Sequence, residues 1–448
     1  MTVTRDDAAV ATGSGLLSPF VFTLRTKGPV GLASRFFTIA TRFGPTPRVM
    51  IRRLDRMVDM AAAMGLLPTC PITTTVLARH PGAVRALSDR GMEFAVHGLR
   101  HNDHIAQDEL TQQREIAKAV EVFARYGLRP TGFRAPYLRS DDATRAAVHA
   151  AGLRYQSDDA VAFRVPNVSG EAVLTDAYQR ALTLYDAQDG ARVACRPTLA
   201  DGLVRIPVCV PDDEMLVDRL HVADRVCADA WRAILDTTHA QGDLFTVQVH
   251  PERLGRSGGA VLAVLERANG LAGGVWTARL DEIADWWRAR AECRLDLGEL
   301  VGERTTVSVV GDRRAGLRLV GGGADADARA VRTMTVSSPR LPAIGVDPSV
   351  PVEVIRFLRE DGYLVLDRPG EYALRLSGPI DPADQMGLRR RIAAAEHPVA
   401  ALDRWPNGRR SALALTGDID ALTIQDFVHR VRENTHGAPT WITGTAAA

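Results

Sequence analysis

The chain has very little lysine, few cysteines and no net charge of consequence. Lys27 and Lys118 are the only lysines among 55 basic residues, so the positive charge is almost all arginine, and a single arginine says little about recognition. The 54 acidic residues leave a net charge of +1, which excludes a global field for nucleic acid or anionic membranes. The five cysteines are scattered without a close C-x-x-C pair, which disfavours a disulfide framework and favours a reducing compartment.

The sequence also lacks the marks of export and membrane insertion. No apolar stretch reaches the roughly 18 residues of a membrane span. The opening MTVTRDDAAVATGSG places acidic residues where a signal peptide has its basic region. The sequence therefore predicts a cytoplasmic protein with no membrane span and no nucleic-acid partner.

The length of 448 residues predicts two or three domains, because a single hydrophobic core rarely grows so large. Residues 1–44 are an N-terminal extension. Residues 45–292 alternate helical and strand patterns, which is typical of a mostly parallel sheet or barrel covered by helices. Within residues 48–65, for example, Met50, Leu54 and Met57 recur at the spacing of one helix face.

The pattern changes near residue 293. Short alternating runs such as TTVSVVGD and EYALRLSG predict a small antiparallel, sandwich-like all-β domain over residues 293–378. Residues 379–448 return to the earlier pattern, with a helix and one more βα unit whose apolar run SALALTGDID ends in two carboxylates. The predicted fold class is α/β, with a small β-domain inserted before the last βα unit.

Three of the 11 histidines lie in the segment VHGLRHNDH, as His97, His101 and His104. A spacing of four lets His97 and His101 face one divalent metal ion if the segment turns helically. A histidine-rich loop without a metal is the alternative interpretation, because a catalytic metal also needs a third ligand.

Candidate partners for the two histidines follow other predicted strands. Arg134 and Tyr137 lie in the rigid turn of GFRAPY, and His250 ends the apolar strand FTVQVHP. Asp418 and Asp420 alternate at the end of LTGDID, so one can bind metal while the other acts as a base. Each residue alone is common in structural roles, but strand ends are where α/β folds display catalytic groups. Together they predict one active site.

Three of these segments resemble the motifs of a known family. H-G-L-R-H at 97–101, R-A-P-Y at 134–137 and V-Q-V-H-P at 247–251 resemble the second, third and fifth motifs of the NodB-type polysaccharide deacetylases, carbohydrate esterase family 4. The resemblance covers residues 45–290 and implies a distorted (β/α) barrel that binds one divalent metal ion. It implies His97 and His101 as metal ligands, Arg134 as the residue that positions the base, and His250 as the general acid. Zinc is the first metal implied, with cobalt, nickel or iron as alternatives.

The chain departs from this family at the first motif, an aspartate pair that precedes the histidines in relatives. Arg42 and Phe43 of FTIATRFGPTP stand where the aspartates should be. The segment WPNGRRSALALTGDIDALT near the C-terminus resembles the missing motif, which implies Asp418 as the base and Asp420 as the metal ligand. Gly98 also replaces the usual Ser or Thr of the second motif.

Three arrangements account for the displaced motif. A circular permutation would encode the opening strand of the barrel last, which is permissible because domain termini often lie close together. In a swapped homo-oligomer the same segment would complete a neighbouring barrel. In the third arrangement the tail is an unrelated βα unit and the protein is an inactive homologue.

The segment LRYQSDD resembles the family's fourth motif, in which an aspartate supports the arginine. The resemblance therefore implies that Asp158 or Asp159 orients Arg134.

The activity implied is hydrolysis of an N-acetyl or similar acyl group on an amino sugar or glycan. Asp418 would take a proton from water, the Tyr137 backbone N–H would help to hold the oxyanion, and His250 would protonate the leaving amine. Two alternatives remain open: an inert barrel that binds glycan or acts as a scaffold, and an amidase of the same fold that acts on a non-sugar substrate.

Overall fold

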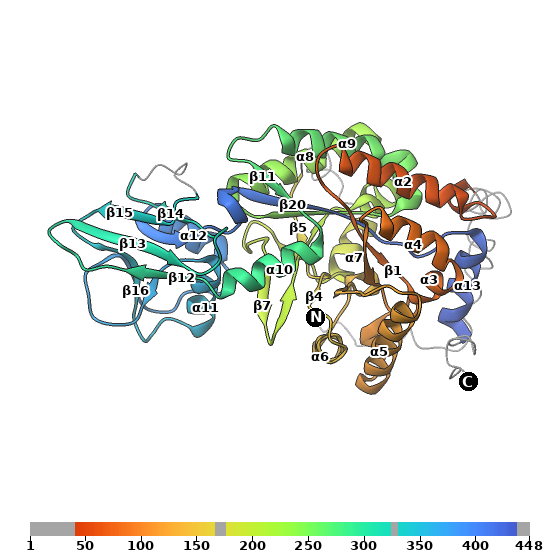
Figure 1. Cartoon of the computed structure of the whole chain (residues 1–448), viewed down its shortest axis with the longest axis horizontal. Coiled ribbons are helices and arrows are strands. Elements are labelled where there is room, and N and C mark those ends of the chain that lie inside the picture. The colour runs from red at the N-terminus through yellow and green to blue at the C-terminus, as the bar shows by residue number, and fades with distance from the viewer. Residues whose placement is uncertain (1–40, 166–175, 324–329, 437–448) are drawn as a thin grey trace, which may run out of the picture.

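The computed structural model describes residues 41–165, 176–323 and 330–436 of the chain. The molecule is elongated, with a large α/β unit at one end and a smaller unit of strands and helices at the other (Figure 1). Of the predicted N-terminal extension, only residues 41–44 fall within the described ranges. None of the helices in those ranges combines the length and apolarity that a bilayer crossing requires.

A mostly parallel, curled sheet forms the centre of the larger unit. Its strand order is β10-β20-β1-β2-β3-β4-β8-β7, with β11 also pairing with β20. Neighbouring strands run parallel except for β7 and β8. The bounds are β1 Thr69–Ile72, β2 Glu93–Val96, β3 Gly132–Phe133, β4 Tyr155–Gln156, β7 Thr198–Ala200, β8 Leu203–Arg205, β10 Leu244–Val249, β11 Val275–Thr277 and β20 Ser411–Gly417. A second parallel sheet joins β5 Ala160–Ala162, β6 Gln188–Asp189 and β9 Val208–Val210. The α/β class predicted from the sequence is confirmed.

The position of β20 in the sheet determines which strand ends lie next to one another. This strand pairs along its length with β10, and its residue Thr416 pairs with Thr69 of β1. Every residue of β10 and β20 is buried, as expected from their continuous apolar pattern, because parallel strands are covered on both faces. The carboxyl ends of β10, β20, β1 and β2 therefore meet at one edge of the sheet.

Helices pack around this curled sheet, with α2, α8 and α9 along one side of the unit and α5 and α6 on the opposite side (Figure 1), and α10 lies against β4, β7 and β8. In α2, the predicted apolar face is buried at Met50, Leu54, Met57 and Val58. The bounds are α2 Arg48–Ala62, α3 Thr74–Arg79, α4 Pro81–Asp89, α5 Glu109–Arg125, α6 Asp142–Ala150, α7 Asp176–Leu184, α8 Asp224–Gln241, α9 Leu254–Asn269, α10 Leu280–Ala291 and α13 Ile424–His436.

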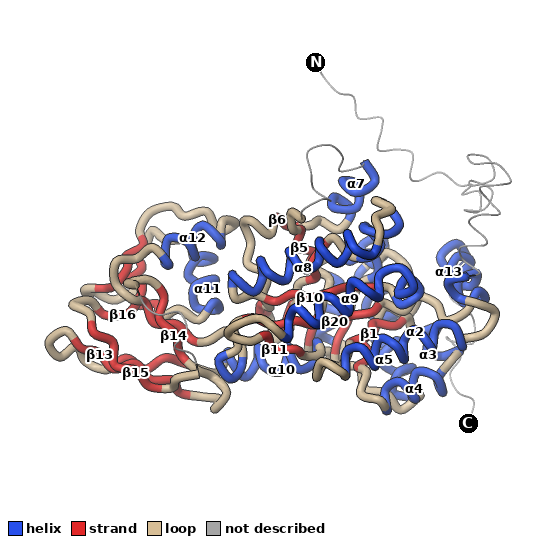
Figure 2. The backbone as a smooth tube through the Cα atoms, turned by 90° about the horizontal axis from the view of Figure 1, so that it is seen from above, coloured by secondary structure: helices blue, strands red, loops and turns tan. Residues whose placement is uncertain are grey.

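The smaller unit is not the antiparallel all-β domain that the sequence predicts. It contains the helix α11, Val352–Asp361 (Figure 2). Its strand β16 pairs in parallel with β17 and β18. The prediction was wrong here because Val354, Phe357 and Leu358 follow helical spacing and bury one helix face. Strand β14 also pairs with β19, which lies beyond residue 378. The bounds are β12 Arg294–Leu297, β13 Arg304–Val310, β14 Leu317–Val320, β15 Thr333–Ser337, β16 Leu341–Val346, β17 Val365–Leu366, β18 Tyr372–Leu376, α12 Gln385–Ala393 and β19 Val399–Leu402.

A buried carboxylate joins the two units. Asp361, at the end of α11, is fully buried and pairs with Arg196 at 3.0 Å, Arg389 at 2.5 Å and Arg404 at 2.7 Å. Burial alone would raise the pKa of Asp361, but the three guanidinium groups hold it well below its usual range.

An Asp361→Asn variant is expected to lose about 3–5 kcal/mol in the free energy of unfolding, because three arginines would each lose one buried carboxylate partner. Urea unfolding followed by tryptophan fluorescence measures the effect. Asp381→Asn is the matched control: its carboxylate pairs with Arg192 while more than half exposed, so its loss should cost about 0–1 kcal/mol. Equal losses in the two variants would show that Asp361 does not join the units.

Candidate active site

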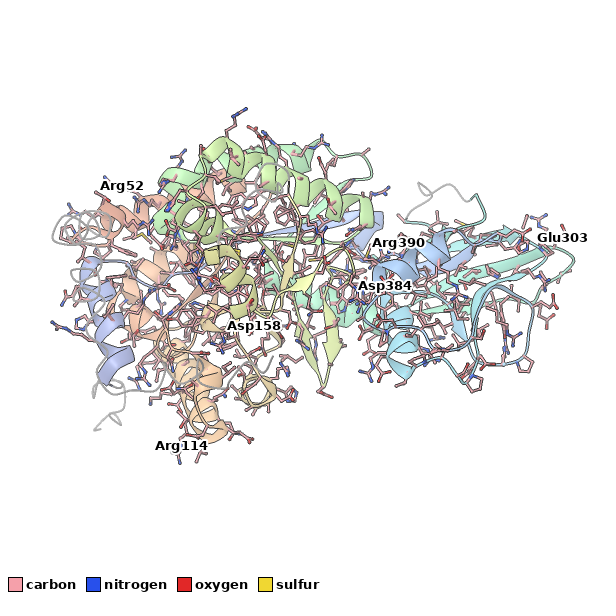
Figure 3. All side chains as sticks on the ribbon, turned by 180° about the vertical axis from the view of Figure 1, so that it is seen from behind. Arg52, Arg114, Asp158, Glu303, Asp384 and Arg390 are labelled. Atoms are coloured by element: carbon pink, nitrogen blue, oxygen red, sulfur yellow. The ribbon has the colours of Figure 1, made fainter. Side chains whose placement is uncertain are left out.

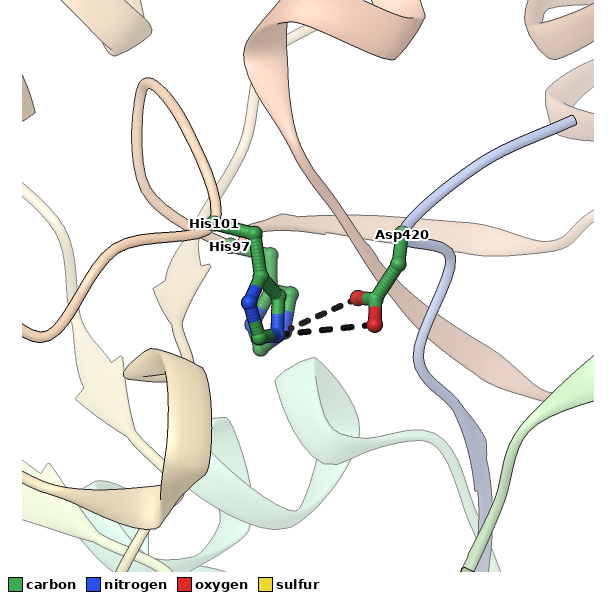
Figure 4. A group of neighbouring side chains, drawn as sticks. All are labelled: His97, His101 and Asp420. Carbon is green, nitrogen blue, oxygen red and sulfur yellow. Dashed lines mark ion pairs between the residues drawn. The ribbon is translucent and has the colours of Figure 1, made fainter. Parts of the chain in front are cut away.

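His97, His101 and Asp420 lie together at the carboxyl edge of the sheet (Figure 4). The distance from His97 Nε2 to Asp420 Oδ1 is 3.5 Å, and that from His101 Nε2 to Asp420 Oδ2 is 3.4 Å. Ligand atoms that surround one tetrahedral zinc ion at about 2.0–2.2 Å are themselves about 3.4 Å apart. The spacing and the donor set of two imidazoles and a carboxylate therefore fit a divalent metal ion.

The turn after β2 brings the two histidines to one point. His97 follows the strand directly, and Gly98 has a φ of 77°. A Cβ atom at residue 98 would lie 2.7 Å from the carbonyl oxygen of Arg100, closer than real side chains approach. Glycine is thus required in this turn, which explains locally why the chain departs from the family's Ser or Thr.

The backbone of the next strand end orients His97. Its Nδ1–H donates a 2.8 Å hydrogen bond to the carbonyl oxygen of Arg134. Because a carbonyl can only accept, Nδ1 carries a proton, and Nε2 is the ring atom that faces Asp420. Histidines that bind a metal through one ring nitrogen usually donate a hydrogen bond from the other, as His97 does here.

The surroundings of His101 and Asp420 favour the deprotonated form of each side chain. Burial lowers the pKa of His101 to about 3. Burial alone would raise the pKa of Asp420, but His101 and Arg430 hold it well below its usual range. Arg430, on α13, contacts the Asp420 carboxylate directly.

Asp418 lies on the same strand end and contacts a different set of groups. Its Oδ1 accepts a 2.8 Å hydrogen bond from Arg134 Nη1, and its Oδ2 accepts one of 3.1 Å from Gln248 Nε2. Arg134 is fully buried and is fixed further by Thr416 Oγ1 at 2.8 Å. Two donors thus fix the position of this carboxylate beside the triad.

Neither Asp158 nor Asp159 orients Arg134, so that expectation is corrected. Ser157 holds the guanidinium instead, with its carbonyl oxygen at 2.8 Å from Nε and its Oγ at 2.9 Å from Nη2. Asp158 accepts from Gln156 Nε2 at 2.8 Å, and Asp159 pairs with Arg205. The segment LRYQSDD does support the arginine, but through the serine before the aspartates.

His250 is paired with a carboxylate that sequence reasoning missed. Its Nδ1 lies 2.7 Å from Asp213 Oδ1, and its backbone N–H donates to Asp213 Oδ2 at 2.8 Å. Burial and Arg253 act to lower the pKa of His250, but Asp213 raises it to about 10. His250 is therefore an imidazolium at neutral pH. Asp213 follows the apolar strand VCV, a strand-end position that is a usable signal in the sequence.

These groups line one cleft of about 370 Å³. Tyr137 lies at its mouth, 40 % exposed, with its ring edge against His101 at a centroid distance of 4.6 Å. All the predicted site residues except Arg134, Asp158 and Asp159 border this space: His97, His101, Tyr137, His250, Asp418 and Asp420. Gln248 and Arg430 border it too, although the sequence analysis gave them no role.

Comparison with known proteins gives the family of the central segment. Residues 52–156 match the family model described as polysaccharide deacetylase. That segment is similar to a polysaccharide deacetylase domain. The matched segment contains His97, His101, Arg134 and Tyr137, whereas His250, Asp418 and Asp420 lie beyond it. The family supports a hydrolase that acts on amide or ester bonds.

Among solved structures, a Mycobacterium smegmatis protein described as a polysaccharide deacetylase shares 21% identity, with a TM-score of 0.43, over 60% of this chain and 84% of its own. A protein from Pseudomonas aeruginosa PAO1 with the same description shares 17% identity, with a TM-score of 0.41, over 53% and 72%. The allantoinase Puue shares 19% identity, with a TM-score of 0.42, over 53% and 72%. No curated protein sequence matches the chain significantly.

Proposed function

We propose that this polysaccharide deacetylase domain is a metal-dependent hydrolase that removes an N-acetyl or similar acyl group from an amino sugar or glycan. The observation that carries the proposal is the meeting of Asp418 and Asp420 with Arg134, His97 and His101 in one cleft, although the aspartates are more than 280 residues away in sequence. A C-terminal βα unit unrelated to the barrel would not be expected to place a base and a third metal ligand beside the two histidines.

His97, His101 and Asp420 would hold the metal ion, with zinc as the first candidate. Such an ion acts as a Lewis acid toward a carbonyl oxygen and makes water a stronger acid. Neutral imidazoles and an ionised carboxylate are the protonation states that metal binding requires.

Asp418 acts as the general base. Arg134 and Gln248 donate to its two oxygens and so orient the carboxylate at the cleft. It takes the proton of the attacking water, and the backbone N–H of Tyr137 is the donor proposed for the oxyanion that develops.

His250 acts as the general acid. It enters the reaction protonated, because Asp213 stabilises the imidazolium. It then gives its proton to the nitrogen that leaves, which yields a free acid and an amino sugar.

The same geometry supports a permuted domain organisation. Strand β20 lies between β10 and β1, so the strand that would open the barrel is encoded last. We therefore propose that residues 379–448 complete the barrel begun by residues 45–292, and that residues 293–378 interrupt it. Asp420 lies 3.5 Å from His97 of the same chain, so one chain can complete the site by itself.

The experiment is hydrolysis of a panel of N-acetylated sugars, before and after chelation with dipicolinate. We expect release of acetate to fall by at least about 100-fold on chelation and to return with added zinc, because the reaction needs the metal's charge. Cobalt, nickel and iron are tested for the same recovery. Activity that is insensitive to chelation would contradict the proposal. Turnover of a cyclic non-sugar amide alone would favour the amidase, and metal-free protein without any turnover would favour the binding or scaffold role.

A further inference from the structure

A second cavity, of about 410 Å³, lies at the junction of the two units. Figure 3 shows this junction, where Arg390 and Asp384 are labelled. The charged residues that line this cavity are six arginines and one aspartate: Arg318, Arg389, Arg390, Arg404, Arg409, Arg410 and Asp403. A single arginine is weak evidence for a binding site in this arginine-rich chain. Six arginines around one cavity repel one another, so each needs a partner that stabilises its charge.

Structural partners account for three of the six. Arg389 pairs with Asp243 at 2.8 Å and with Asp361, and Arg404 also pairs with Asp361. Arg410 donates to the carbonyl oxygens of His239 and Ala240 in the last turn of α8, where a cation complements the helix dipole.

Among the described residues, the other three form no ion pair shorter than 3.9 Å with a carboxylate. Arg318 donates to the carbonyl oxygens of Leu402 and Asp361, and Asp361 and Asp403 act on its charge without forming a direct ion pair with it. Its pKa is lowered to about 10 by burial and by neighbouring Arg404. The nearest carboxylate to Arg390 is that of Asp384, at 3.9 Å.

Arg409 adds a guanidinium that makes no side-chain hydrogen bond or ion pair within the described ranges. The lone lining carboxylate, Asp403, is already engaged, since its Oδ2 accepts a 3.2 Å hydrogen bond from the backbone N–H of Ala330. The cavity therefore presents excess positive charge with free donors.

We propose that this cavity binds a small molecule bearing one or two phosphate groups. Planar guanidinium groups donate pairs of hydrogen bonds to phosphate oxygens, which makes arginine well suited to this anion. The remaining wall is apolar, formed by Leu319, Val320, Met386 and Ala393 beside the Tyr363 ring, so the ligand can carry an uncharged part. The volume lies within the range of small-molecule sites.

The site is separate from the catalytic cleft. The cavity borders Arg410, just before the first residue of β20, whereas Asp418 follows its last residue. Seven strand residues span roughly 20 Å. The phosphate ligand is therefore not the substrate of the hydrolase, and this inference stands or fails independently of the proposed activity.

The test measures thermal unfolding and isothermal titration of the full chain with inorganic phosphate, inorganic pyrophosphate and ADP, at constant ionic strength. We expect saturable binding of pyrophosphate or ADP, with a rise in Tm of at least about 2 °C at saturation. The Arg390→Gln/Arg409→Gln double variant should bind about 10-fold or more weakly, while its Tm without ligand stays unchanged because neither side chain makes a strong internal contact.

The matched control is Arg52→Gln/Arg114→Gln, which removes the same charge from two exposed positions far from the cavity (Figure 3). This control should bind as the unaltered protein does. Tighter binding of ADP than of pyrophosphate would identify a nucleotide as the ligand, and equal binding would identify the free polyphosphate. Absence of saturable binding, or equal weakening in both double variants, would overturn the proposal.

Discussion

An Asp418→Asn variant is expected to lose about 10²- to 10⁴-fold in kcat while it keeps its affinity for metal. The amide cannot accept the proton of the attacking water, and general base catalysis typically contributes a factor of that size. Asp418 contacts Arg134 and Gln248 and does not belong to the group His97, His101 and Asp420 that would hold the metal ion. The variant should therefore still bind metal. The measurements are kcat on the best sugar of the panel and metal content by mass spectrometry.

The control for this variant lies two residues away. Asp420→Asn makes the same chemical change on the carboxylate that faces both histidines, and it should lose bound metal as well as activity. The opposite pattern, with metal lost in Asp418→Asn and kept in Asp420→Asn, would exchange the roles of the two aspartates. Since Arg134 is buried and loses a counter-charge, Tm is compared for both variants to separate misfolding from lost chemistry.

Much of the candidate site could be predicted because its residues stand at strand ends in short, recognisable segments. Both histidines, His250 and both aspartates could be named from the sequence, and they line one cleft. Arg134 could be named too, and it contacts Asp418 from beneath. The apolar runs that become β10 and β20 also indicated buried parallel strands.

The partners of these residues could not be predicted in the same way. Asp213 meets His250 through the packing of β9 against β10, and nothing local in the segment PDDEML says which strand it will face. Ser157 holds Arg134 partly through its backbone carbonyl, a contact that does not depend on its side chain. The small unit was misjudged because a ten-residue helix, α11, sits among short strands.

The pH dependence of kcat/KM tests whether His250 is the general acid. In the unaltered protein His250 is protonated up to a pKa of about 10, so kcat/KM should fall on the alkaline side only near that pH. In an Asp213→Asn variant the carboxylate that raises the pKa of His250 most is gone. Burial and Arg253 still lower that pKa, and only the weaker effect of Glu252 still raises it. The alkaline limb should then move to below about pH 7, a shift of at least 3 units, with a tenfold loss per unit above the new pKa.

Asp212→Asn is the control for this shift. Asp212 is equally buried and adjacent in sequence, but its carboxylate accepts from the backbone N–H of Met215 at 2.8 Å instead of from His250. Its replacement should move the alkaline limb by less than about 1 unit. If both variants keep the limb near pH 10, the group that donates the proton is not His250. If Asp213→Asn lowers kcat/KM equally at every pH, Asp213 only positions the ring, because a residue that sets the proton affinity of His250 must change the shape of the profile as well as its height.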